Sequence, residues 1–552
     1  MALKIPQRHV GDWSKEIIDE CCSSRDSRRE NIKIWRNYYQ AGTETGDQAR
    51  YNKCYGHVDR LASYLFSPAD VRFDVEIDLT DSEEDKSIAQ ASSRYLNREF
   101  ERCSVDTSFS QGVNWALVKG ATLLKILWGH EGLEPWLVHP EFFGVLREDI
   151  TDLERQEAFV HTTYITDTEL RRQLFDHPQL EAIMAEVENG TRAQREQDEF
   201  TDSFFHQILI GGINPVSTTG ISQGRGSVAV APNIPMLAAE VARRLIRVDE
   251  LWVVDRDRDD YTTLRICYPD IVIEGKYKHR NLSGVDREQP FRLICPNQSD
   301  GYFWGSSEII QISPLQDMLN GQLRDWSRLV RLKSDPPRAM TGFTGMTQEK
   351  YRSIRRPGGF ISEENPNAKT QELAPEIPRE LIESIGKTIE YFDDVAGFAP
   401  ILAGQGEQGV SAGVHAQTLA RNASPRMRDR ALTVERQCVD VGDFCFKLLQ
   451  AKESSVFLSE KKERFLLGQL ENNYRIVVDS HTSSPAYSED NERKAFLLAR
   501  SGAIDNADLI WLTHPPHEDV LIARARARAA QEAALIKEHP ELLTKGKGPK
   551  KK

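Results

Sequence analysis

Residues 313–333 read SPLQDMLNGQLRDWSRLVRLK, and this stretch decides the fold. Large apolar side chains recur in it at steps of four, four, three and four residues, at Leu315, Leu319, Leu323, Trp326 and Val330. This spacing predicts an amphipathic helix. The opening Ser-Pro-Leu-Gln is typical of a capping box with proline at the first helical position, so the sequence predicts a helix start here. The helix should end before the prolines at 336–337, because proline disfavours helical backbone in the residue before it.

A second helix is predicted from Pro378 to about Gly397, with one apolar face made by Ile382, Ile385, Ile389, Phe392 and Val395. About forty residues punctuated by glycine separate the two helices, which favours a small lobe and an antiparallel helix pair. The first helix carries Arg324, Arg328 and Arg331 on one face, and the second is acidic. These charges either pair, within one copy of the chain or between copies, or form two ordinary solvated faces.

Other segments mix helical and strand patterns and predict an α+β fold. The first hundred residues are mainly helical, with an alternating strand at 71–77. A buried strand that ends at Trp128 follows. Short β segments at 251–254, 262–267, 271–273 and 291–295 predict an antiparallel meander. Residues 211–235 are rich in Gly, Ser, Thr and Pro and predict a flexible insertion. A long helix should run from about Ser411 to Gln450, bent at Pro425.

The composition excludes several classes of protein. The chain has 552 residues, 39% of them hydrophobic and 28% charged, and a formal net charge of −13. It contains neither a run of 18 apolar residues nor an apolar leader, so we expect a soluble, unsecreted protein that does not cross a membrane. Its eight cysteines form no CxxC pair, which favours reduced thiols in a cytosol-like compartment.

The charge is unevenly distributed along the chain. Residues 521–552 carry +6, which leaves −19 on the remainder and disfavours DNA wrapping over the whole surface. Arg524, Arg526 and Arg528, with the lysines of the tail, predict either a polyanion contact that is independent of sequence or a solubilising tail. A second basic cluster lies in the lobe between the two helices, at Lys350, Arg352, Arg355 and Arg356. This cluster either contacts an acidic partner or DNA, or is an ordinary solvated face.

Catalytic and cofactor motifs find little support. Gly404-Gln-Gly406-Glu-Gln-Gly409 matches G-x-G-x-x-G, but it follows no strand and lies between helices, so it predicts a glycine hinge. No phosphate-binding loop or nucleophile elbow occurs. His514 and His517 are separated by two prolines, which prevents helical metal-ligand spacing. The sequence therefore predicts no catalytic residue, no metal site, no cofactor and no enzyme.

The order of these elements resembles the portal proteins, or head–tail connectors, of tailed bacteriophages. The similarity covers roughly residues 50–500. It rests on the ordered set of stretches 57–66, 71–77, 120–128, 302–310, 314–320, 357–361, 389–400 and 409–414. The resemblance implies a ring subunit with an α/β wing, a two-helix stem, a small α/β clip, a long kinked helix and a C-terminal helical crown.

The resemblance divides the chain into seven regions. These are a wing region at 1–305 that contains the 211–235 insertion, a first stem helix at 306–333, a clip at 334–377, a second stem helix at 378–397, a tunnel loop at 398–411, a long helix with a wing return at 412–505, and a crown with a basic tail at 506–552. The tunnel loop residues Gly404, Gln405, Gly406, Glu407, Gln408 and Gly409 should line the narrowest point of a channel.

By resemblance, the chain assembles as a homo-oligomer, usually of twelve copies, at one vertex of the capsid in the virion, after assembly in the host cytoplasm. Double-stranded DNA passes through without sequence specificity. The implied protein partners are the large terminase subunit, head-completion or adaptor and tail proteins, the major capsid protein and a scaffolding protein. The arginines at 324, 328 and 331 would face either the channel or a neighbouring acidic helix. Two other classes remain open: an oligomeric virion scaffold or tail adaptor without DNA passage, and an enzyme acting on a charged polymer.

Overall fold

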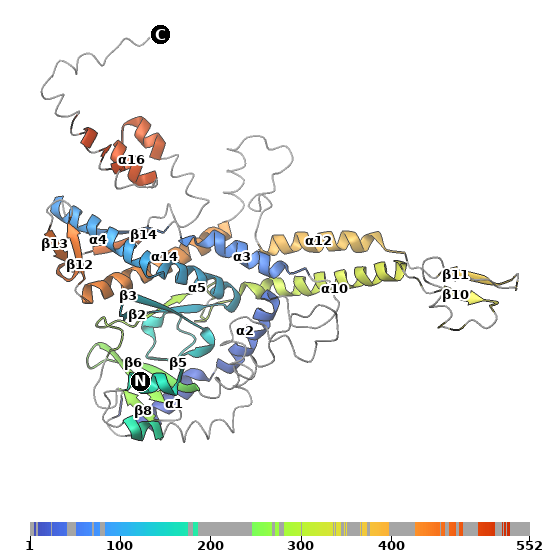
Figure 1. The fold of residues 1–552 in the computed structure, drawn as a ribbon, viewed down its shortest axis with the longest axis horizontal. Helices are drawn as coiled ribbons and strands as arrows, with labels where there is room; N and C mark the ends of the chain where they lie inside the picture. The colour runs from blue at the N-terminus through green and yellow to red at the C-terminus, as the bar shows by residue number, and fades with distance from the viewer. Residues whose placement is uncertain are drawn as a thin grey trace, which may run out of the picture. The chain divides into compact units, whose positions relative to one another are not determined.

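The computed structural model describes most of residues 9–40, 51–174, 180–185, 245–343, 365–396, 425–478 and 495–531. Its helices and strands confirm the predicted α+β class (Figure 1). The named elements are, in chain order, α1 (Val10–Cys22), α2 (Arg25–Tyr39), α3 (Lys53–Leu65), β1 (Phe73–Ile77), α4 (Glu83–Arg102), α5 (Val105–Lys119), β2 (Thr122–Gly129), β3 (Gly132–Val138), β4 (Phe143–Val145), β5 (Ala158–Thr166), α6 (Asp167–Gln173), β6 (Leu245–Asp255), β7 (Asp260–Cys267), β8 (Ile271–Glu274), β9 (Phe291–Ile294), α10 (Glu308–Ser334), β10 (Arg338–Thr341), β11 (Lys369–Glu372), α12 (Arg379–Ala396), α14 (Pro425–Ala451), β12 (Ser455–Leu458), β13 (Glu463–Leu466), β14 (Tyr474–Val478) and α16 (Asn506–Thr513).

The chain forms two compact units, each built from several segments. The first unit comprises Met1–Arg60, Gly112–Lys125 and Leu137–Arg430, and the second comprises Leu61–Gln111, Ile126–Trp136 and Ala431–Lys552. Segments far apart in the sequence therefore belong to the same unit. Helices α10 and α12 both belong to the first unit.

The first unit contains a five-stranded antiparallel sheet in the order β4-β5-β6-β7-β8. The three strands β6, β7 and β8 form the meander that the sequence predicted. The segment at 291–295, expected in the same meander, instead forms β9, which pairs with β2 in a three-stranded sheet of order β3-β2-β9. The prediction was wrong there because a short apolar strand carries no signal for its partner, and Phe291 pairs with Lys125, far away in the chain.

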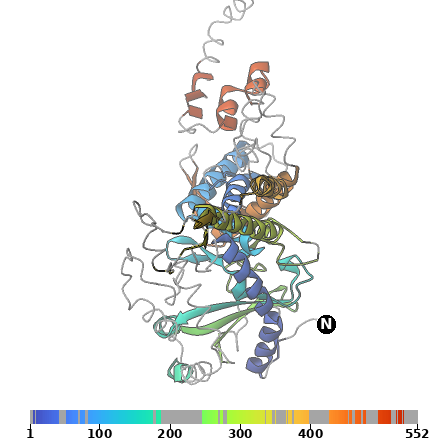
Figure 2. The same ribbon diagram turned by 90° about the vertical axis from the view of Figure 1, so that its right-hand side faces the viewer.

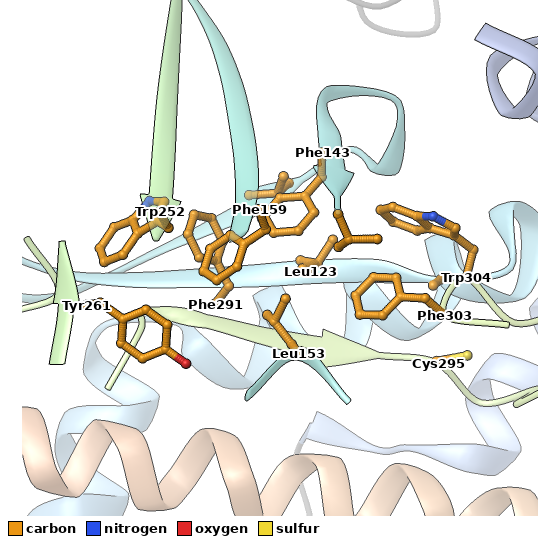
Figure 3. Packing of buried hydrophobic residues seen from close by; sticks show 13 residues of the cluster. Leu123, Phe143, Leu153, Phe159, Trp252, Tyr261, Phe291, Cys295, Phe303 and Trp304 are labelled. Carbon is orange, nitrogen blue, oxygen red and sulfur yellow. The ribbon is translucent and has the colours of Figure 1, made fainter. Parts of the chain in front are cut away.

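Alternating side chains place a separate apolar core on each face of the five-stranded sheet. On one face, Val160 and Leu251 pack against α1, which lies along the sheet in both views (Figures 1 and 2). On the other face, Phe143, Phe159 and Trp252 pack against Phe291 of the three-stranded sheet, as Figure 3 shows. Buried aliphatic side chains on one face and buried aromatic rings on the other stabilise this part of the unit.

Helix α2 is fixed to the same body by two buried arginines. The Arg25 guanidinium donates to Thr162 Oγ1 at 3.0 Å. Arg28 donates to Glu148 Oε1 at 2.7 Å and to the Phe143 carbonyl at 2.6 Å, and its guanidinium lies 3.7 Å from the centre of a Trp304 ring. Such charge-assisted hydrogen bonds are stronger than neutral ones, so they hold the helix in a defined orientation.

The second unit is organised around a strand pair that joins distant parts of the chain. Strand β1 pairs antiparallel with β14, from Phe73 opposite Val478 to Ile77 opposite Tyr474. Helix α4 packs on β1, and Asn97 uses its side-chain amide to bond both the N–H and the C=O of Phe73. The Phe73 ring lies so close to Gly442 of α14 that an added Cβ there would stand 2.3 Å from it.

Candidate functional site: the α10–α12 hairpin

Helices α10 and α12 lie side by side in opposite directions and form a hairpin at the residues of the predicted stem, hereafter the stem hairpin (Figure 1). Gln322 of α10 donates to Ser384 Oγ at 2.8 Å and accepts from Thr388 Oγ1 at 3.0 Å. The antiparallel pair β10–β11, with Arg338 opposite Glu372 and Thr341 opposite Lys369, lies between the two helices in the chain. The predicted antiparallel pairing of the two helices is therefore confirmed.

The start of α10 differs from the prediction. The helix begins at Glu308, and Pro314 lies inside it. Ser307, rather than Ser313, makes the side-chain hydrogen bonds at the start of the helix. Its Oγ accepts from the Ile309 N–H at 3.2 Å and donates to the Val118 carbonyl at 2.5 Å. Burial of Ile309 and Ile312 extends the helix towards its N-terminus. Pro314 has no N–H group to donate to the Ile310 carbonyl. The Ser313 hydroxyl lies 3.4 Å from this carbonyl oxygen.

A buried ionic cluster ties the first residue of α10 to two other helices. Glu308 Oε1 lies 3.2 Å from His57 Nε2 of α3, and its Oε2 lies 3.1 Å from a guanidinium nitrogen of Arg430 in α14. The Asn297 amide also donates to Oε2 at 3.0 Å. Burial raises the pKa of Glu308, but the His57 hydrogen bond and the Arg430 charge outweigh it and lower this pKa to about 2. The carboxylate is therefore ionised in the folded protein.

A second anchor joins both helices of the hairpin to the start of α3. Gln316 Oε1 accepts from the N–H groups of Lys53 and Cys54, at 2.9 and 3.3 Å, so it satisfies donors that a helix start leaves without partners. The Lys53 ammonium lies 2.7 Å from Asp393 Oδ1 of α12. One turn of α3 thus contacts α10 and α12 at the same time and fixes the base of the hairpin.

The distal part of the hairpin is poorly buried. No residue from Asn320 to Ser334 and none from Arg379 to Lys387 is buried. Several large apolar side chains of the hairpin are more than a third exposed: Met318, Trp326, Leu332, Ile382, Tyr391 and Val395. An amphipathic helix gains its stability by burying its apolar stripe, and two helices alone leave part of it in water.

The predicted basic face lies on this distal part. Arg324, Arg328 and Arg331 are exposed on α10, and their helical spacing places them opposite the face that carries Gln322. On α12, Glu383, Glu390 and Asp394 are exposed on the face turned away from Ser384. No residue of the described chain forms an ion pair with Arg324 or Arg328. The outer face of α10 is therefore basic, whereas α12 carries exposed Arg379 and Lys387 beside its carboxylates.

The other predicted sites lie partly or wholly outside the described residues. The tunnel loop at 398–411 with Gly404–Gly409, the clip cluster Lys350, Arg352, Arg355 and Arg356, the insertion at 211–235 and the two histidines 514 and 517 all fall outside them. Arg524 and Arg528 are described as exposed helical residues, and Arg526 is not described. Of the predicted site residues, the structure therefore describes the basic face of α10 and two arginines of the C-terminal cluster.

Sequence reasoning missed the buried ionic groups. Lys119 lies 3.1 Å from Glu141 Oε2 and 2.6 Å from His139 Nδ1, and burial lowers the pKa of Lys119 and takes that of His139 to about 3. A similar cluster joins Lys125 to Glu250 at 2.5 Å. Each member is separated from its partner by many residues, so no local pattern marks them. They cross-link the strands and helices of the first unit.

Within the described residues, no group of three or more His, Cys, Asp and Glu side chains is arranged to hold a metal ion. In the same part of the chain, no helix is both long and apolar enough to cross a bilayer.

A scan against protein-family models gives no match for this chain, and a search of curated proteins finds none with significant sequence similarity.

Proposed function

We propose that this chain is the subunit of a phage portal ring, the channel at one capsid vertex through which double-stranded DNA is packaged and ejected. The observation that carries the proposal is the stem hairpin. Its base is fixed by Glu308 and Lys53, while its distal part leaves Trp326 and Ile382 exposed. A rigidly held hairpin with uncovered apolar side chains is suited to packing against copies of itself around an axis.

The charge of the chain supports passage rather than capture of DNA. Twelve copies of a chain of net charge −13 would carry about −156, and double-stranded DNA carries one negative charge per ~1.7 Å. A ring so acidic repels the polyanion at long range and forms few tight phosphate contacts. DNA can therefore slide, which a conduit requires.

The remaining roles follow from the same proposal. The β10–β11 end of the hairpin, with the clip residues that lie between these strands in the sequence, would dock the large terminase subunit during packaging and the head-completion and tail proteins afterwards. The loop at 404–409 would line the narrowest point of the channel, because its glutamines and glutamate supply no cation that binds phosphate. The basic C-terminal residues would contact DNA on the capsid side.

The first test is the mass of the purified full-length chain in solution, measured by sedimentation velocity. We expect one closed oligomer, many times the 62.7 kDa of a single chain. A chain that stays monomeric at micromolar concentration would refute the proposal.

A second measurement separates a conduit from an oligomeric scaffold or tail adaptor, which the exposed hairpin also permits. Deletion of residues 404–409 in assembled particles should reduce the DNA retained per particle, because the narrowest point of the channel is widened. Replacement of the same six residues by an equally long Gly/Ser segment is the control for loop length. Unchanged DNA content in the deletion would favour the scaffold.

A further inference from the structure

Each helix of the stem hairpin contains an interior glycine that packing does not explain. These residues are Gly321 of α10 and Gly386 of α12, and a Cβ added at either would meet nothing within 4 Å. Neither glycine has a positive φ, so the backbone conformation does not require glycine there. Glycine is the weakest helix former after proline, because it leaves the backbone free to adopt other conformations. Its effect at these two positions is therefore to weaken the helix.

The two glycines lie at the same height in the hairpin. Gln322 of α10 is hydrogen-bonded to both Ser384 and Thr388 of α12. Gly386 lies midway between these two residues in the helix, so it is level with Gln322. Gly321 precedes Gln322 by one residue, which is a rise of about 1.5 Å. The same hydrogen bonds join the two helices at this height, so a bend in one helix is transmitted to the other.

Burial changes at this height as well. Towards the base, the nearest buried residues are Leu319 and Thr388, each two positions from the glycine of its helix. Towards the tip, no residue from Asn320 to Ser334 and none from Arg379 to Lys387 is buried. Movement of the distal part about the glycines therefore uncovers no fully buried side chain, while the base stays packed.

Pro314 is another residue of α10 at which a bend is expected, because proline interrupts the backbone hydrogen bonds of a helix. It lies within the fixed base, however, where Ile312 and Gln316 on either side of it are buried. The Gln316 side chain also accepts hydrogen bonds from the N–H groups of Lys53 and Cys54. A bend at Pro314 is therefore held in one position, whereas the helices from the two glycines to the tip contain no buried residue that would hold them.

We propose that Gly321 and Gly386 form a hinge, at which the distal part of the stem hairpin, with β10 and β11 at its end, bends against the fixed base (Figure 1). This inference rests on the hairpin alone and does not require the proposed ring. Ser334 lies thirteen residues beyond Gly321, which is about 20 Å of helix. A bend of about 20° at the hinge would therefore move Ser334 by about 7 Å.

Double electron–electron resonance on the full-length chain tests the hinge. Nitroxide labels at K33C and S334C span the hinge, whereas labels at K33C and M318C both lie on its base side. Serine replaces Cys22 and Cys103, the two cysteines that are not buried. The labelled chain is diluted into an excess of unlabelled chain before assembly, so that only distances within one copy are measured. We expect the distance distribution across the hinge to be about twofold wider than the one on the base side, or more.

Alanine at both glycines should stiffen the hinge, because alanine stabilises both helices and its Cβ enters open space. In the G321A/G386A variant, the distribution across the hinge should narrow to within about 1.3-fold of the base-side width. The G56A variant is the matched control, since this glycine of α3 also borders open space, and it should leave both distributions unchanged.

Two results would overturn the hinge. One is an equal width of the two distributions in the unmodified chain. The other is a wide distribution across the hinge that persists in G321A/G386A, because fraying at the end of α10 would then be its cause. Neither result changes the mass of the assembled chain, so the proposed ring is tested separately.

Discussion

Glu308 Oε1 lies 3.2 Å from His57 Nε2, and both side chains are buried where α10 leaves the body of the first unit. The second carboxylate oxygen lies 3.1 Å from the Arg430 guanidinium. A single carboxylate thus joins three helices at the base of the stem hairpin. Because an unpaired charge is costly to bury, this cluster is stable only with all of its members present.

Replacement of this carboxylate should destabilise the protein strongly. Glu308→Gln leaves the Arg430 guanidinium without its buried counter-charge, so we expect the free energy of unfolding to fall by about 3 kcal/mol. Urea unfolding followed by circular dichroism measures the loss. Glu383→Gln on the exposed face of α12 is the control and should change the free energy by less than about 0.5 kcal/mol. Equal effects of the two substitutions would contradict the structural role.

The same carboxylate predicts a pH dependence. Its pKa of about 2 in the folded protein lies below the ordinary value of 4.5, so its contribution is complete above pH 4.5 and is lost as the pH falls towards 2. Between pH 6 and pH 2, the unmodified chain should therefore lose on the order of 3 kcal/mol more stability than Glu308→Gln. The other carboxylates are present in both proteins and cancel in the comparison. Parallel curves for the two proteins would contradict the assignment.

Gly442 should tolerate no side chain. In Gly442→Ala the new Cβ would stand 2.3 Å from the Phe73 ring, so we expect a loss of about 1–3 kcal/mol. Gly56 of α3 is the matched control, because an added Cβ meets nothing within 4 Å. Gly56→Ala should be neutral, or stabilising by up to about 1 kcal/mol, since alanine favours helix. Thermal unfolding of both variants measures these changes in stability. A Gly442→Ala protein as stable as the unmodified chain would contradict the packing of Phe73 against Gly442.

Gln316 should stabilise the start of α3. Gln316→Leu removes the acceptor for the N–H groups of Lys53 and Cys54, and we expect a cost of about 1–2 kcal/mol, similar to the loss of a helix cap. Hydrogen exchange at the start of α3 should accelerate in this variant. Gln322→Leu, which loses only side-chain partners on α12, should leave exchange at α3 unchanged. If α3 exchanges at the same rate in both variants, Gln316 is not its cap.

The basic C-terminal helix should add weak contacts with DNA. In the R524A/R528A variant, the slope of log affinity against log salt should become shallower by about 1.8, because each phosphate contact contributes about 0.9. Binding of the assembled protein to a duplex of random sequence, measured across NaCl concentrations, gives this slope. The K15A/K33A variant should keep the slope of the unmodified chain. An unchanged slope for R524A/R528A would favour the solubilising role.

Local pattern predicted the helices of the hairpin well and their surroundings poorly. The apolar stripe of α12 is complete within its own residues, so its bounds agree with the prediction to within a residue or two. The predicted first helical residue, Pro314, lies six residues after the actual start of α10, because Glu308 is held by His57 and Arg430, which lie more than one hundred positions away. For the same reason the partner of β9 and the pairing of β1 with β14 had no signal in the sequence.

Of the candidate site, periodicity could predict the arginines on one face of α10, because exposed charges at helical spacing need no tertiary contact to be recognised. The anchors Gln316 and Lys53 could not be predicted, because each is a single polar residue whose role depends on a distant backbone. Position on a local face is thus readable from the sequence, while the contacts that fix the hairpin depend on the whole fold.

Electron microscopy of the purified full-length chain tests the central claim most directly. Class averages viewed along the symmetry axis should show a closed ring with an open hole wide enough for a DNA duplex, and side views should show the α10–α12 hairpins arranged around that hole. Particles without an axial opening, or hairpins that point away from the axis, would contradict the account.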